Sequence, residues 1–79
     1  MTLSSAVKAM LQTCGKLQGD LGEYFGMSKQ SMANKMKNER WSGKDLVRAA
    51  DFCGCRVAII CPDGSQIMLD APQVDGAEE

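Results

Sequence analysis

QGDLGEYFGMSKQSM, residues 18–32, is the stretch that decides the fold, because it predicts two short helices joined by a tight turn. Leu21 and Phe25 lie four positions apart and give the first helix an apolar edge. Gly26 suits the left-handed backbone conformation that ends a helix, and Ser28 is a typical N-cap residue for the next one. Two short helices separated by a glycine-containing turn form a helix-turn-helix arrangement.

The flanking sequence predicts one further helix on each side of this pair. Upstream, Ser4 and Ser5 are N-cap candidates for a helix that ends at Gly15. Its apolar residues recur with helical spacing: Val7, Met10, Leu11 and Cys14. Downstream, residues 42–45 read as a capping box, which opens a fourth helix that ends at Gly54. The residues expected to face inward there are Leu46, Val47, Ala50 and Cys53.

The pattern of apolar residues changes from helical spacing to that of β-strands toward the C-terminus. Residues 56–61 are apolar and β-branched, Pro-Asp-Gly at 62–64 is a turn signal, and residues 66–69 form a second short strand. A β-hairpin over 56–69 is therefore expected to complete one domain of residues 1–69. Both faces of this hairpin are largely apolar, but a hairpin that covers a small helical core buries only one of them.

The second apolar face of the hairpin predicts a homodimer. A domain of this size has a thin core, and dimerisation is a simple way to supplement it. The residues expected at the subunit interface are Ala58, Ile60 and Met68. The alternative is that the helices bury both faces within one subunit.

Charge is distributed unevenly along the 79 residues, although the net charge is only −1. Residues 70–79 contain four acidic residues and no basic one, and their composition predicts a disordered acidic tail. A group of basic residues surrounds the single acid Glu39: Lys29, Lys35, Lys37, Arg40 and Lys44. Such a group suits a polyanionic partner, and a merely solvated helix face would explain it as well.

Several other functions are disfavoured by what the sequence lacks. The four cysteines contain no C-x-x-C pair and the chain has no histidine, so we expect small apolar packing residues and no metal or other cofactor. Without histidine, a paired-carboxylate motif or a phosphate loop, an enzyme is not expected. No apolar run reaches the ~20 residues that cross a bilayer, and the N-terminus does not read as a signal peptide. A cytoplasmic protein is therefore expected.

Residues 18–32 resemble the signature of Cro/repressor-type (XRE-family) domains, Q-x-x-L-A-x-x-L-G-[IVM]-S-x-x-x-[IVLM]. The resemblance extends over residues 5–55 and is to small stand-alone members from bacteria and phages. Gly22 departs from the usual alanine, and Lys35 stands where many members have an apolar residue. The resemblance implies a mainly α fold, a four-helix Cro/repressor-like helix-turn-helix domain, here with a C-terminal β-hairpin.

The resemblance also implies a function and the residues that carry it. Residues 28–37 would be the recognition helix, and on its helical period the side opposite Met32 and Met36 is polar. The residues expected to read bases are Lys29, Gln30, Ser31 and Asn34. Those expected to contact phosphates are Gln18, Lys35, Lys37, Asn38, Arg40 and Lys44.

Sequence-specific binding of double-stranded DNA is therefore predicted, in a transcriptional repressor that occludes a promoter. The alternative is a protein-interaction module, an accessory or inhibitor protein that keeps the helix-turn-helix frame without binding DNA. The low overall charge and the acidic residues after 69 favour this alternative, whereas Lys29 and Gln30 at the start of the recognition helix favour DNA. Trp41 is expected in the core rather than stacked on a base.

Overall fold

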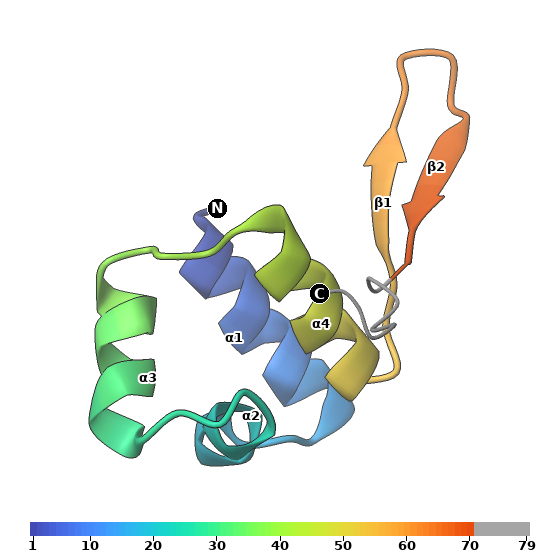
Figure 1. The fold of residues 1–79 in the computed structure, drawn as a ribbon. Helices are drawn as coiled ribbons and strands as arrows, with labels where there is room; N and C mark the ends of the chain where they lie inside the picture. The colour runs from blue at the N-terminus through green and yellow to red at the C-terminus, as the bar shows by residue number, and fades with distance from the viewer. Residues whose placement is uncertain (71–79) are drawn as a thin grey trace, which may run out of the picture.

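The computed structural model describes residues 1–70, which form four helices followed by one antiparallel β-hairpin (Figure 1). The elements are α1 (Leu3–Cys14), α2 (Gln18–Tyr24), α3 (Lys29–Lys37), α4 (Gly43–Phe52), β1 (Val57–Ile60) and β2 (Gln66–Leu69). The predicted order of a small, mainly helical domain with a C-terminal hairpin is confirmed. The predicted disordered tail lies, from residue 71 onward, outside the described residues. Within the described part, no helix is long and apolar enough to cross a membrane.

The helix ends follow the sequence signals with one exception. Ser28 and Ser42 cap α3 and α4 as predicted, each accepting a hydrogen bond from the amide three residues on. Gly15 ends α1 in the left-handed conformation, with φ of 69°. The predicted capping of α1 by Ser4 or Ser5 is wrong, because Thr2 accepts the hydrogen bond from the Ser5 amide (3.1 Å).

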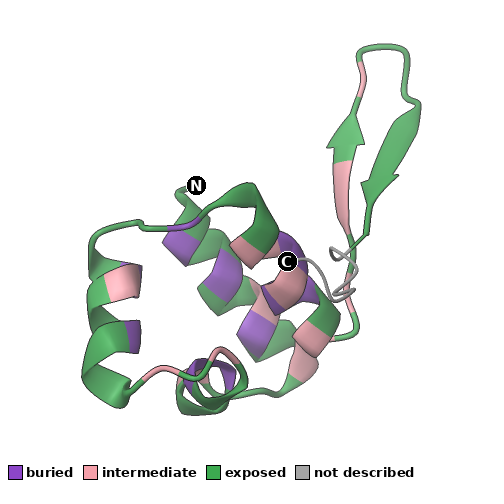
Figure 2. Cartoon of the chain, viewed as in Figure 1, coloured by how far each residue is buried: buried purple, intermediate pink, exposed green. Residues whose placement is uncertain are grey.

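A single apolar core lies between the helices (Figure 2). Its buried members are Val7, Leu11, Leu21, Met32, Met36, Trp41 and Ala49. The predicted inner edge of α3 and the predicted core position of Trp41 are confirmed. Two residues of α4 differ from expectation: Leu46 is only half-buried, whereas the small side chain of Ala49 is fully enclosed.

Ser4 is buried because it joins α1 to the segment that follows α3. Its hydroxyl donates to the carbonyl oxygen of Met36 (2.6 Å) and accepts from Trp41 Nε1 (3.0 Å). Its amide donates to Glu39 Oε1 (3.0 Å), and this hydrogen bond holds the pKa of the Glu39 carboxyl below its ordinary value. The serine therefore satisfies two polar groups that would otherwise be buried without partners.

The hairpin extends away from the helices instead of covering them (Figure 1). Val57 pairs with Leu69 and Ile60 with Gln66 in the antiparallel register. Ile59 is 52% exposed and Ile60 is 71% exposed, so the outer part of the hairpin presents both faces to solvent. Only the first two residues of β1 are half-buried, so the expectation that one face of the hairpin packs on the helical core is wrong for the rest of the hairpin. The alternative, that the helices bury both faces, is also wrong.

Candidate nucleic-acid interface

Close packing of α2 against α3 sets the position of the predicted recognition helix. Gly22 is buried at the crossing, where an added Cβ atom would lie 3.3 Å from Met32 Cβ and 3.6 Å from the carbonyl oxygen of Met27. Leu21 and Met32, both almost wholly buried, anchor the two helices to the same core. The turn at residues 25–28 and this packing thus hold α3 with its Met32 side toward the core and its opposite side toward solvent.

The outward side of α3 is polar, and its side chains are exposed. Gln30 Nε2 donates to Asn34 Oδ1 across one helical turn (3.3 Å), so these two amides form a paired surface. Ser31 accepts a hydrogen bond from the hydroxyl of Ser28 (3.1 Å). The exposed polar residues of α3 and its C-terminal end are Lys29, Gln30, Ser31, Asn34, Lys37 and Asn38.

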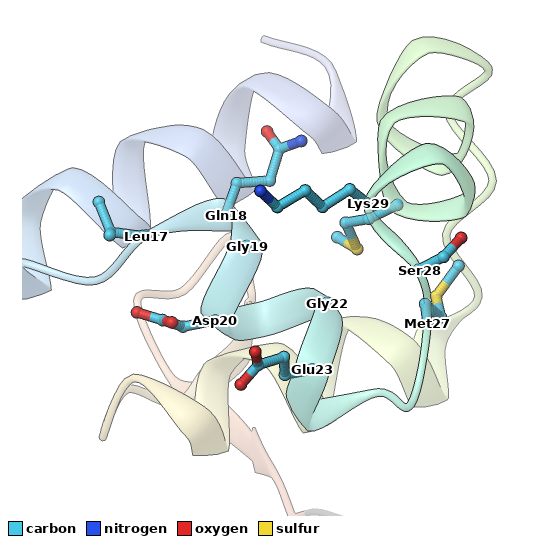
Figure 3. Close-up of a pocket in the computed structure, with 10 residues that line it drawn as sticks. Leu17, Gln18, Gly19, Asp20, Gly22, Glu23, Met27, Ser28 and Lys29 are labelled. Atoms are coloured by element: carbon cyan, nitrogen blue, oxygen red, sulfur yellow. The ribbon is translucent and has the colours of Figure 1, made fainter.

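A hollow of about 670 Å³ lies between α2 and α3 (Figure 3). Gln18, at the start of α2, and Lys29, at the start of α3, both line it, so the structure brings these two predicted DNA-contacting residues together. No side chain caps the N-terminus of α2. Asp20 and Glu23 line the same hollow, which gives it mixed charge and leaves Lys29 as its one basic side chain.

Lys35 does not have the position that the sequence analysis gave it. Its ammonium group lies 2.5 Å from Asp45 Oδ2 and donates to the carbonyl oxygen of Arg40 (2.7 Å), and its side chain is only 11% exposed. The same group lies 4.9 Å from the ring centroid of Trp41. The predicted phosphate contact through Lys35 is therefore wrong, because its charge is satisfied inside the protein.

The remaining basic residues of this region are free to meet a partner. Lys29, Lys37, Arg40 and Lys44 are exposed, and none of them forms an ion pair within residues 1–70. A second hollow, of about 360 Å³, lies beside α3. Its lining brings polar residues of α3 next to the following connector: Met27, Ser31, Asn34, Lys35, Asn38 and Arg40. Lys44 lies apart from both hollows, in the first turn of α4.

Sequence reasoning missed two residues that shape this surface. Asp45 was expected only as part of a helix cap, but it also neutralises Lys35, at a spacing of ten residues that no local pattern predicts. Arg48 has its guanidinium over the ring of Phe25 (4.9 Å) and near that of Tyr24 (5.7 Å), on α2 and its end. Arg48, on α4, therefore contacts the C-terminal end of α2 through these two rings.

Comparison with protein-family models, with curated proteins and with solved structures found no match to this chain.

Proposed function

We propose that this protein binds double-stranded DNA, with α3 in the major groove. The observation that carries the proposal is the two-sided character of α3, in which Met32 and Met36 are buried while Gln30 and Asn34 present paired amides to solvent. Asparagine and glutamine amides match the donor and acceptor pattern that adenine shows in the major groove. Helix-turn-helix proteins read bases with the N-terminal part of their second helix.

The polar side chains of this surface have one of two roles in this proposal. Lys29, Gln30, Ser31 and Asn34 read base edges. Gln18, Lys37, Asn38, Arg40 and Lys44 contact phosphates. With four exposed basic side chains near the duplex, binding would be strongly dependent on salt concentration. The protein would act in the cytoplasm as a transcriptional repressor that occludes a promoter.

A second copy of the chain is the proposed partner of the hairpin. A two-stranded hairpin is marginally stable by itself, and only the start of this one contacts the helices, through α4. One face carries four aliphatic side chains: Val57, Ile59, Ile67 and Leu69. The opposite face, which the sequence analysis favoured, carries Ala58, Ile60 and Met68 but also the polar Gln66. We therefore assign the aliphatic face to a two-fold interface, which would set two α3 helices on successive half-sites.

The test starts from a pool of random-sequence duplexes, from which the protein should enrich one motif. Gln30→Ala and Asn34→Ala should each weaken binding to that motif by about 10- to 100-fold, with circular dichroism unchanged. Gln12→Ala is the matched control, since Gln12 is also an exposed helical glutamine but lies on α1, and it should leave affinity unchanged. Failure to enrich any sequence, or full affinity in the Gln30→Ala and Asn34→Ala double variant, would overturn the proposal in favour of a protein-interaction module.

A further inference from the structure

Three of the four cysteines meet where the helical body joins the hairpin. Cys14 is the last residue of α1, Cys53 caps the end of α4, and Cys55 lies in the link to β1. All three are half-buried, not fully enclosed in the way that packing residues would be. The sulfur atoms of Cys14 and Cys55 are 3.4 Å apart although 41 positions separate the two residues in sequence.

A separation of 3.4 Å places the two sulfur atoms in van der Waals contact. A disulfide bond is about 2.05 Å long, so the two sulfur atoms need to approach by roughly 1.4 Å. Cys14 is the last residue of α1 and Cys55 lies in the link before β1, so rotation of both side chains contributes to that approach. A metal site is not supported, because residues 1–70 contain no group of three or more ligating side chains placed to hold an ion.

We propose that Cys14 and Cys55 are a redox-active thiol pair, which closes to an intramolecular disulfide on reaction with a low-molecular-weight disulfide such as oxidised glutathione. This proposal is independent of DNA binding. Disulfides in cytoplasmic proteins are mostly transient and redox-sensing. The bond would connect the end of α1 to the segment before β1, and within residues 1–70 no disulfide cross-links these two parts of the chain.

The reaction proceeds by two thiol–disulfide exchanges. The Cys14 thiol loses its proton to solvent, and its thiolate attacks one sulfur of the small disulfide, forming a mixed disulfide and releasing one small thiolate. The Cys55 thiol then loses its proton to solvent, and its thiolate attacks Cys14 Sγ, forming the protein disulfide and releasing the second small thiolate, which takes up a proton as the first one does. The two cysteines are oxidised by two electrons in total, and one small disulfide is reduced to two thiols.

The hydrogen bonds of the pair assign this order of attack. The Cys55 thiol donates to the carbonyl oxygen of Cys53 (3.7 Å), which favours its protonated form. The contact with Cys14, followed by burial, raises the pKa of Cys55, while burial, followed by Cys14, raises the pKa of Cys53. The raised pKa of Cys55 and its hydrogen bond to the Cys53 carbonyl oxygen make Cys55 the attacking group of the second step. Closure should accelerate as pH rises.

The test uses the full chain, reduced and then incubated with oxidised glutathione under native conditions before remaining thiols are alkylated. Trypsin separates Cys14, in residues 9–16, from Cys53 and Cys55, in residues 49–56, and from Cys61 in the C-terminal peptide. Before alkylation, the expected product is a chain 2 Da lighter than the reduced one and without an intermolecular disulfide, and its digest contains peptide 9–16 linked to peptide 49–56. Cys53→Ser and Cys61→Ser should retain this link, whereas Cys14→Ser and Cys55→Ser should lose it.

The matched pair Cys53→Ser and Cys55→Ser separates the proposed bond from its neighbour. Both residues are in the same tryptic peptide, so only loss of the link in Cys55→Ser with retention in Cys53→Ser supports the assignment. A link that survives Cys55→Ser would assign Cys53 as the partner and overturn the proposal. Linkage through Cys61, a Cys53–Cys55 bond within one peptide, or no disulfide until denaturant is added would each overturn it as well.

Discussion

The ammonium group of Lys35 lies 2.5 Å from the carboxylate of Asp45 and joins the last turn of α3 to the first turn of α4. Aromatic rings surround this pair, since the same ammonium lies 4.9 Å from the centroid of Trp41 and 5.8 Å from that of Phe25. A lysine therefore occupies a position at the edge of the core, and its charge is matched across the helix pair. This contact fixes how the polar face of α3 is presented.

Lys35→Ala should lower stability without changing the salt dependence of DNA binding. The substitution leaves Asp45 partly buried without its partner, so we expect the free energy of unfolding in urea to fall by about 1–2 kcal/mol. Lys37→Ala is the control on the same helix, with an exposed side chain. It should leave the urea midpoint unchanged and reduce the slope of log affinity against log salt by about 1. Reversed behaviour of the two variants would contradict the assignment of Lys35 to structure.

Acid should weaken the same contact. Burial raises the pKa of the Asp45 carboxyl, but the hydrogen bond and charge of Lys35 outweigh burial and leave the pKa below its ordinary value of 3.8. A carboxyl whose pKa is lowered on folding stabilises the protein above the unfolded-state pKa, and this stability is lost as pH falls through the folded-state value. The stability advantage of the wild type over Asp45→Asn should therefore be constant from pH 7 to 5 and shrink below about pH 4 in urea titrations. An advantage that does not shrink as pH falls below about 4 would contradict the ion pair.

Ser4→Ala should be more damaging than a surface serine substitution. It removes both the donor to the Met36 carbonyl and the acceptor for Trp41 Nε1, and so leaves two buried groups unsatisfied. We expect the free energy of unfolding to fall by about 2–3 kcal/mol. Ser5→Ala is the neighbouring control, since Ser5 is exposed and its hydroxyl contacts only the hydroxyl of Thr2. Equal effects of the two substitutions would show that the Ser4 network contributes little.

The helical frame was predictable because its signals are local. Ser28 and Ser42 each lie directly before the helix they cap, and Met32 and Met36 lie one turn apart. The residues that differed from prediction depend on distant contacts. From the sequence alone, Ser4 is a typical N-cap residue, and only the fold shows that it contacts Trp41, 37 positions later. Lys35 is likewise a typical exposed base, and only the fold shows that it pairs with Asp45. No local pattern carries that information.

The hairpin was predictable as an element but not in its placement. Alternation and the turn at residues 62–64 locate the strands, whereas no local pattern in them shows that the hairpin extends away from the helices. The Cys14–Cys55 contact was missed for the same reason, since it needs the ends of α1 and α4 to be adjacent.

Gly22→Ala should be tolerated, and Gly22→Leu should not. An alanine Cβ would lie 3.3 Å from Met32 Cβ, an atom attached to the α3 backbone, so α3 must shift by a few tenths of an ångström. Alanine also favours the helical conformation over glycine by up to ~1 kcal/mol, which offsets that movement. The free energy of unfolding of Gly22→Ala, measured in urea, should stay within about 1 kcal/mol of wild type. Leucine should lower the free energy of unfolding by more than about 2 kcal/mol, because α2 and α3 would have to separate; equal tolerance of both would contradict the close crossing.

The two faces of the hairpin give the last prediction, because adjacent residues offer the same substitution on opposite sides. Ile59 belongs to the face with Val57, Ile67 and Leu69, and Ile60 belongs to the other. Aspartate is costly wherever the site is dry, and neither isoleucine is buried within one chain, so helicity should be unchanged in both variants. In sedimentation velocity, Ile59→Asp should convert a dimer to a monomer, whereas Ile60→Asp should raise the dissociation constant much less.

Three results would contradict this assignment, and each points elsewhere. If Ile60→Asp alone dissociates the dimer, the interface is the face with Ala58 and Met68. If either variant loses helicity, that isoleucine packs within its own subunit, against its exposure of 52% for Ile59 and 71% for Ile60. A wild-type protein that sediments as a monomer at about 100 μM would contradict the homodimer itself. Its dissociation constant would then exceed about 100 μM, which corresponds to less than about 6 kcal/mol of association free energy.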